Sequence, residues 1–219
     1  NAKFESCTIA GNTSYENGGA MFVWNGHANM YNCTISDNTA DVQGGGIFLF
    51  SHLSGSATLR SCILWNNNAT EVEGKTISVQ HSDIEGGYTG TGNINAEPRF
   101  VDSDGWDYHL LWDSPCIDTG DPTYIPQPSD KDIDKEPRVM RDNRVDMGSD
   151  EVGLKQADFD RNGIIDSRDL SVLVNSWLTV QGDENWYVLC DLFDDQQIDT
   201  MDYARFATDW LWQAEWYED

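Results

Sequence analysis

The sequence predicts a mostly β chain that ends in a small all-α module. Three observations lead to this prediction. A repeat of short strand-like segments fills residues 1–100, loop-rich sequence fills residues 101–152, and a duplicated spacing of acidic residues with helical apolar stripes lies within residues 153–219. These three ranges are the domains that we expect.

Cysteines mark the repeat in residues 1–100. Cys7, Cys33 and Cys62 recur at nearly equal intervals, and a short segment of β-branched or aliphatic residues follows each of them. One repeat of this size cannot bury its own apolar face, whereas stacked copies can. An asparagine stands at the same distance after each cysteine, and these are Asn12, Asn38 and Asn67.

Stacked copies place equivalent residues on neighbouring strands about 4.8 Å apart. The cysteines and aliphatic side chains then form inward ladders, in which a cysteine acts as a small hydrophobic side chain. The asparagines are expected to hydrogen-bond to one another along the stack. The repeat therefore predicts a parallel β-helix, and the sequence resembles right-handed β-helix repeats of the pectate-lyase-like kind.

Residues 101–152 interrupt the repeat with prolines and glycines. Together with the residues just before them, they resemble the choice-of-anchor segment that follows β-helices in secreted bacterial proteins. A cap over the last repeat is physically needed, because an open repeat exposes unpaired strand edges. The resemblance implies that the chain is the C-terminal part of such a protein.

Residues 158–169 space their oxygen ligands as a calcium loop does. Side-chain oxygens occupy loop positions 1, 3, 5, 9 and 12, and the peptide carbonyl of Ile164 serves position 7. Gly163 stands at position 6, where the sharp turn of such a loop requires glycine. This spacing predicts a Ca²⁺ site. Its side-chain ligands are Asp158, Asp160, Asn162, Asp166 and Asp169.

The same unit recurs further along the chain, beginning at Asp191. Phe193 at position 3 and Gln196 at position 6 depart from the pattern, so we expect the second calcium site to be weaker or absent. Its ligands are Asp191, Asp195, Asp199 and Asp202, with the carbonyl of Gln197 at position 7. After each loop, an apolar helical stripe is expected to form the core between two helices. The stripes are Leu170, Leu173, Val174, Trp177 and Leu178, and then Tyr203, Phe206, Ala207, Trp210 and Leu211.

Two details distinguish these units from a calmodulin-type hand. Position 12 is Asp rather than Glu, and no long helix precedes the first loop. Both features resemble a type I dockerin, in which two loop-helix units pack antiparallel. The resemblance implies a protein partner, either cohesin-like or another copy of the chain, that is recognised through loop positions 10 and 11. Those positions hold Ser167, Arg168, Thr200 and Met201.

Charge and hydropathy exclude some partners. The chain has 38 acidic and 13 basic residues, a net charge of −25, which argues against nucleic acid or an anionic membrane surface. No apolar run approaches the roughly 20 residues of a membrane-spanning helix. The odd count of five cysteines does not establish a disulfide framework. The two resemblances imply an extracellular or cell-surface protein.

Three functions stay open at this point. The first is a non-catalytic extracellular calcium-binding module. The second is the C-terminal part of a polysaccharide lyase or hydrolase, and the third is a subunit of a homo-oligomeric fibre. Polysaccharide is also a possible ligand, through exposed aromatic residues such as Trp24.

No catalytic residue is assigned, because the candidate side chains do not recur at equivalent repeat positions and fold alone does not establish activity. Two of these candidates, Asp83 and Glu85, are expected to point outward from a last strand. The candidates are His27, His52, Arg60, His81, Asp83, Glu85 and Arg99.

Overall fold

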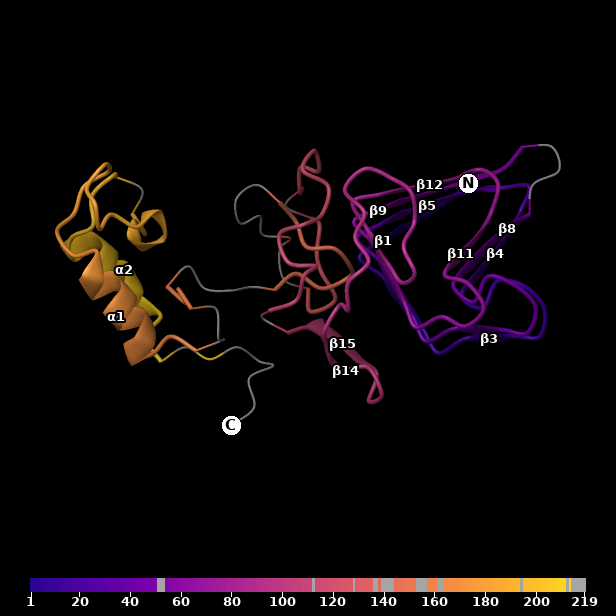
Figure 1. Cartoon of the computed structure of the whole chain (residues 1–219), viewed down its shortest axis with the longest axis horizontal. Helices are drawn as coiled ribbons and strands as arrows, with labels where there is room; N and C mark the ends of the chain where they lie inside the picture. Colours follow the sequence, from indigo (N-terminus) through magenta and orange to yellow (C-terminus); the bar gives the residue numbers. More distant parts are fainter. Residues whose placement is uncertain are drawn as a thin grey trace. The chain divides into compact units, whose positions relative to one another are not determined.

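The computed structural model divides the chain into two compact units. Unit 1 is Asn1–Val152 and unit 2 is Gly153–Asp219. The described residues are 1–50, 54–111, 113–127, 129–135, 138, 144–152, 157–160, 164–193, 195–211 and 213. Within them, unit 1 consists of short strands, and unit 2 contains helices α1 (Ser167–Asn175) and α2 (Thr200–Thr208) and the 3-10 helix η1 (Val188–Cys190) (Figure 1). No helix of the described part is both long and apolar enough to cross a membrane.

Unit 1 stacks its strands into parallel sheets, because each repeat contributes one strand to each of the two four-stranded sheets. One sheet has the order β1-β5-β9-β12 and a second β11-β8-β4, and Figure 1 labels the strands of both. A third sheet has the order β13-β10-β6-β2, and β3 pairs with β7. This confirms a mostly β chain with parallel strands, an arrangement compatible with a β-helix. The strands are β1 (Ala2–Glu5), β2 (Thr8–Ala10), β3 (Thr13–Ser14), β4 (Met21–Trp24), β5 (His27–Tyr31), β6 (Thr34–Ser36), β7 (Thr39–Ala40), β8 (Ile47–Phe50), β9 (Ser56–Arg60), β10 (Ile63–Trp65), β11 (Val72–Gly74), β12 (Ile77–Gln80) and β13 (Asp83–Ile84).

The strand register is the one that the cysteine repeat predicts. Ile35 of β6 lies between Ile9 of β2 and Leu64 of β10, so residues equivalent in the repeat are neighbours in the sheet. Cys33 and Cys62 have no exposed surface, and they are free thiols that pack with the aliphatic core. The inward cysteine ladder is therefore confirmed.

The asparagines form the expected ladder at the turns. Asn12 Nδ2 donates to Asn38 Oδ1 at 3.0 Å, and Asn38 Nδ2 donates to Asn67 Oδ1 at 2.8 Å. Asn67 Nδ2 then donates to a carboxylate oxygen of Glu71 at 2.5 Å. Burial raises the pKa of Glu71 to about 8, although Asn67 opposes the shift.

Replacing the central asparagine of the ladder should destabilise unit 1. Asn38 is completely buried, and Asn38→Ala leaves the carbonyls of Ile9 and Ser36 without this donor. We expect a loss of about 2–3 kcal/mol in the free energy of unfolding, measured by urea denaturation. Asn12→Ala at the exposed end of the ladder is the matched control and should cost under about 1 kcal/mol. Equal losses in the two variants would show that the ladder does not stabilise the stack.

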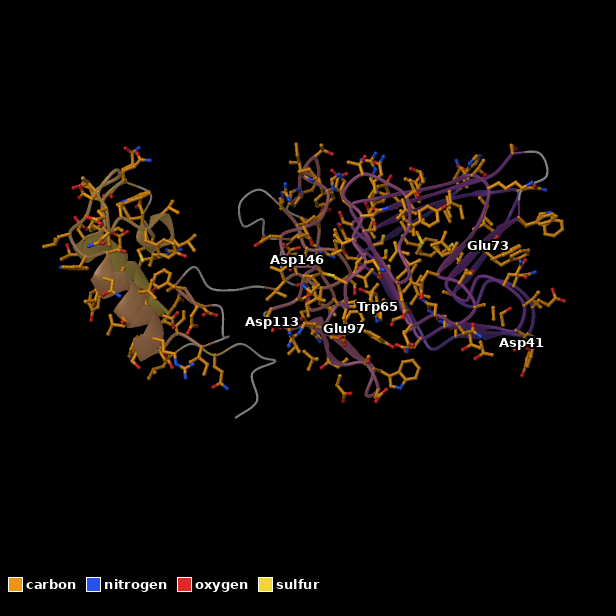
Figure 2. The ribbon with its side chains drawn as sticks, in the orientation of Figure 1. Asp41, Trp65, Glu73, Glu97, Asp113 and Asp146 are labelled. Carbon is orange, nitrogen blue, oxygen red and sulfur yellow. The ribbon has the colours of Figure 1, made fainter. Side chains whose placement is uncertain are left out.

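Residues 101–152 lie mainly against the side of the stack, whereas a cap over the last repeat was predicted. β14 (Phe100–Asp102) and β15 (Asp107–Leu110) form an antiparallel hairpin. Leu110, Cys116 and Met147 pack in one cluster with Ile63 of β10. The segment settles there because the outward face of this sheet carries an apolar side chain that must be buried. Figure 2 shows Asp113 and Asp146 in this segment, and Asp41, which follows β7, and Glu73 of β11 away from it.

Asp83 points outward as predicted, because it is the register partner of Ile63 on the outward face of the sheet. It nevertheless has no exposed surface, because Ala96 and Cys116 of the following segment lie against its carboxylate. Its carboxylate accepts the Ala96 N–H at 3.1 Å and the Cys116 thiol at 3.3 Å. Burial raises the pKa of Asp83. Glu85, on the same segment, is exposed as predicted.

Candidate metal centre

Three of the predicted calcium ligands lie together in unit 2. Asp158, Asp160 and Asp169 each offer a carboxylate oxygen, and these oxygens lie within 4.8 Å of one another. Asp158 and Asp169 are completely buried, whereas Asp160 is exposed. The first loop thus gathers carboxylates from its two ends into one small volume.

Asp169 fastens the start of helix α1 to the start of the loop. One carboxylate oxygen accepts the backbone N–H of Phe159 at 2.7 Å, and the other accepts the N–H of Asp166 at 3.0 Å. Asp166 is the N-cap of α1, and its side chain accepts the N–H of Arg168 at 2.7 Å. This reciprocal capping arises because aspartates stand at the N-cap and at the third helical position. The helix thereby fixes the position of one ligand.

The other predicted residues of the first loop differ in their backbone pairing and exposure. Ile164 forms an antiparallel bridge with Gln213, which orders the backbone at loop position 7. Ser167 and Arg168 are exposed on the first turn of α1. Asn162 and Gly163 lie outside the described residues.

The second loop has the same backbone frame. Asp202 is buried, and its carboxylate accepts the N–H of Phe193 at 3.0 Å and of Asp199, the N-cap of α2, at 2.7 Å. The carboxylate of Asp191 accepts the N–H groups of Asp195 at 3.1 Å and of residue 196 at 2.9 Å. The loop therefore wraps around the carboxylate at position 1.

The departures at positions 3 and 6 have visible consequences in the second loop. Phe193 is 55% exposed and brings no oxygen. Gln196 adopts a left-handed φ of 67°, a conformation that costs a residue with a side chain about 1–2 kcal/mol. The described carboxylates of this loop do not form a group of three as close as that of the first loop. Of the other predicted residues, Gln197 bridges Val180, and Thr200 and Met201 are exposed.

The two loop-helix units are joined by pairings that occupy equivalent positions in the two copies. The Leu178 N–H donates to the Ile198 carbonyl at 2.8 Å, and the equivalent Leu211 N–H donates to the Ile165 carbonyl at 2.9 Å. Each loop is therefore held by the segment that follows the other helix. The shared core contains Ala157, Phe159, Ile165, Leu173, Cys190, Ile198 and Phe206.

The prediction that both apolar stripes lie wholly in this core is wrong. Leu173 and Phe206 are the completely buried stripe residues in the described part, whereas Leu178 and Leu211 are 72% and 67% exposed. Each helix has nine residues, so it presents only a short face to the core. Leu178 and Leu211 follow the helices with left-handed φ values of 60° and 63°, which turn the chain away.

The first loop fits calcium by the chemistry of its donors. Its three carboxylates are hard oxygen ligands, which Ca²⁺ prefers. Carboxylates this close, two of them buried, repel one another when ionised, and a divalent cation between them balances their charge. Asp160, the exposed member, leaves an entry path to solvent.

A second cluster, in unit 1, consists of His109, Asp134 and Asp150. His109 Nε2 lies 2.9 Å from Asp134 Oδ2, and Nδ1 contacts Asp107. Burial lowers the pKa of His109, but the carboxylates outweigh this effect and raise it to about 9. Because both ring nitrogens face carboxylates, we interpret the cluster as an ion-paired imidazolium. Sequence reasoning missed it, since His109 and Asp150 are far apart along the chain and belong to no motif.

The candidate catalytic residues that the sequence offered in unit 1 do not gather into one site in the described part of the chain. Arg60 pairs with Asp121 and Arg99 with Asp113. His52 lies outside the described residues. Comparisons with known proteins add no assignment: no family model matches the chain, and no curated protein or solved structure is significantly similar to it.

Proposed function

We propose that the chain is an extracellular calcium-binding module, in which a dockerin-like unit 2 attaches a right-handed β-helical unit 1 to a protein partner. The observation that carries this proposal is the group of Asp158, Asp160 and Asp169, whose oxygens lie within 4.8 Å of one another. Its spacing in the sequence and its closeness in space point to the same hard cation.

The duplicated architecture of unit 2 supports a role in attachment. Ser167 and Arg168 on α1, and Thr200 and Met201 on α2, are exposed next to the two loops. Calcium in the first loop would hold the start of α1 through Asp169, which also completes the capping box of that helix. A cohesin-like protein or a second copy of the chain is the partner class that we propose for these residues.

The acidic surface supports a location outside the cell. Extracellular calcium modules work with dissociation constants of about 10⁻⁴–10⁻³ M, and one incomplete loop beside a complete one suits that range. The net charge of −25 also favours cation binding.

Paired substitutions in the two loops test the calcium assignment. Asp158→Asn and Asp191→Asn keep the shape of the position 1 side chain and remove its charge. We expect Asp158→Asn to weaken calcium binding at least tenfold, and Asp191→Asn to change it less than threefold. The calcium affinity of both variants is measured by titration, followed by tryptophan fluorescence and by far-ultraviolet circular dichroism. Equal weakening would show that the loops do not differ, and no weakening would contradict the site.

A further inference from the structure

A cavity of about 210 Å³ lies in unit 1, beside the sheet of β1, β5, β9 and β12. Tyr31 and Arg60, which are register partners at the ends of β5 and β9, line one side, and Asp121 and Tyr124 line it from residues 121–125. Ligand sites usually measure about 300–1,000 Å³. This cavity therefore has room for one small ring rather than for an extended ligand.

The polar groups of the cavity are fixed by their neighbours. Arg60 Nη1 donates to Asp121 Oδ2 at 2.8 Å. Asp121 is 4% exposed, its N–H donates to Ser61 Oγ at 2.8 Å, and its Oδ1 accepts the Thr123 N–H at 2.9 Å. The Tyr124 hydroxyl donates to Asp130 at 2.7 Å. A ligand would thus meet walls that are already ordered, which lowers the entropic cost of binding.

Hydrogen-bonding capacity is left over on both strands. A guanidinium has five N–H donors. The Arg60 side chain is 40% exposed, and in the described part of the chain it donates to Asp121 through Nη1. The Tyr31 hydroxyl makes no hydrogen bond to a described residue, and its ring is held under Lys3 at 5.6 Å. The cavity therefore offers hydrogen-bond donors beside an aromatic side chain.

Charge decides which ligand class suits this cavity. Arg60 and Asp121 neutralise each other, and the chain as a whole carries −25, so an anion is repelled. A cation is repelled by the positive charge of the Arg60 guanidinium. A neutral polyhydroxylated ring accepts hydrogen bonds from Arg60, donates to Asp121 Oδ2, and packs its apolar face on Tyr31. We propose that the cavity binds a neutral sugar residue, which gives unit 1 a ligand beyond the attachment role proposed above.

Protein-observed NMR of the full chain tests the proposal with D-glucose, D-galactose, D-mannose and D-xylose as probes. We expect at least one of them to shift the Arg60 side-chain N–H signal, with a dissociation constant of about 1 mM, as befits a small ligand. Tyr31→Ala should weaken this binding at least tenfold, because Tyr31 is an outward side chain whose removal spares the core. Tyr15→Ala, which removes an exposed tyrosine away from the cavity, is the matched control and should leave binding unchanged.

Several results would overturn the proposal. They are no shift with any probe at about 50 mM, full binding by Tyr31→Ala, equal losses in Tyr31→Ala and Tyr15→Ala, or tighter binding of glucuronate or glycine than of every neutral sugar. If Tyr31→Ala does not fold, Tyr31→Phe takes its place and should bind about threefold more weakly, from loss of one hydroxyl. Unchanged binding by a folded Tyr31→Phe would count against the proposal.

Discussion

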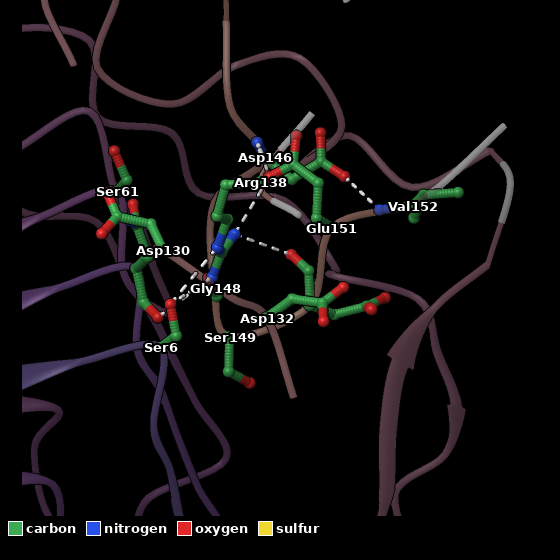
Figure 3. A network of polar contacts seen from close by, with 12 residues as sticks. Ser6, Ser61, Asp130, Asp132, Arg138, Asp146, Gly148, Ser149, Glu151 and Val152 are labelled. Atoms are coloured by element: carbon green, nitrogen blue, oxygen red, sulfur yellow. Dashed lines mark hydrogen bonds and ion pairs between the residues drawn. The ribbon is translucent and has the colours of Figure 1, made fainter. Parts of the chain in front are cut away.

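Arg138→Met should destabilise unit 1 by about 3–5 kcal/mol, because it leaves a buried carboxylate without its cation. The Arg138 side chain is completely buried and donates to Glu151 Oε2 at 3.0 Å (Figure 3). It also donates to the Gly148 carbonyl at 2.7 Å and to Ser6 Oγ at 3.3 Å. One side chain therefore ties the first repeat to the end of unit 1.

The environment of Arg138 explains the size of the expected loss. Asp146 lies beside Glu151 and is buried, and its carboxylate accepts the N–H groups of Asp118 at 2.7 Å and of Val152 at 2.8 Å (Figure 3). Burial raises the pKa of Asp146, and the nearby Glu151 raises it further. Without the guanidinium, this acidic pair has no buried cation left to balance it among the described residues.

Urea denaturation of wild type and variant measures the loss of stability. Arg99→Met is the matched control, because the Arg99–Asp113 pair is partly exposed, and exposed pairs contribute about 0–1 kcal/mol. A loss for Arg138→Met no larger than that for Arg99→Met would contradict the proposed role of the buried network.

Unit 1 should lose stability as the pH rises from about 5 to about 9. Burial raises the pKa of Asp150 to about 6, of Glu151 to about 7 and of Glu71 to about 8. An acid whose pKa is raised in the folded state stabilises that state at low pH, and the contribution disappears as the pH passes the raised pKa. His109, with a pKa raised to about 9 by its carboxylate partners, loses its contribution between about 6.5 and 9 in the same direction.

Each unit of pKa shift corresponds to about 1.4 kcal/mol, so the combined effect is on the order of several kcal/mol. We expect the melting temperature of unit 1 to fall by on the order of 10 °C between pH 5 and pH 9, as measured by scanning calorimetry. Glu71→Gln is the control, because it removes one titrating group and should make the melting temperature depend less on pH. A melting temperature that stays constant or rises over this range would contradict these pKa directions.

The features that repeat along the chain were predictable. The spacing of Cys7, Cys33 and Cys62 indicated the strand register, and the asparagines indicated the ladder, because parallel stacking brings equivalent positions together. The calcium-loop spacing likewise indicated which carboxylates would meet, since the ligands of one loop are close in sequence.

The features that depend on contacts distant in sequence were not predictable. Arg138 donates a hydrogen bond to Ser6, which lies at the other end of the unit 1 sequence. Asp83 is buried by Cys116 of the segment that follows the repeat. No local periodicity encodes such contacts. The exposure of Leu178 and Leu211 was missed for a different reason: an apolar stripe at helical spacing does not show where the helix ends.

Calorimetric titration of the full chain with Ca²⁺, after removal of metal with EDTA, tests the central claim most directly. We predict one well-defined site, abolished by Asp158→Asn, together with a higher melting temperature of unit 2 in calcium, because a ligand that binds only the folded state stabilises it. Absence of calcium binding at millimolar concentration, or binding that survives Asp158→Asn unchanged, would contradict the assignment of Asp158, Asp160 and Asp169 as a calcium site.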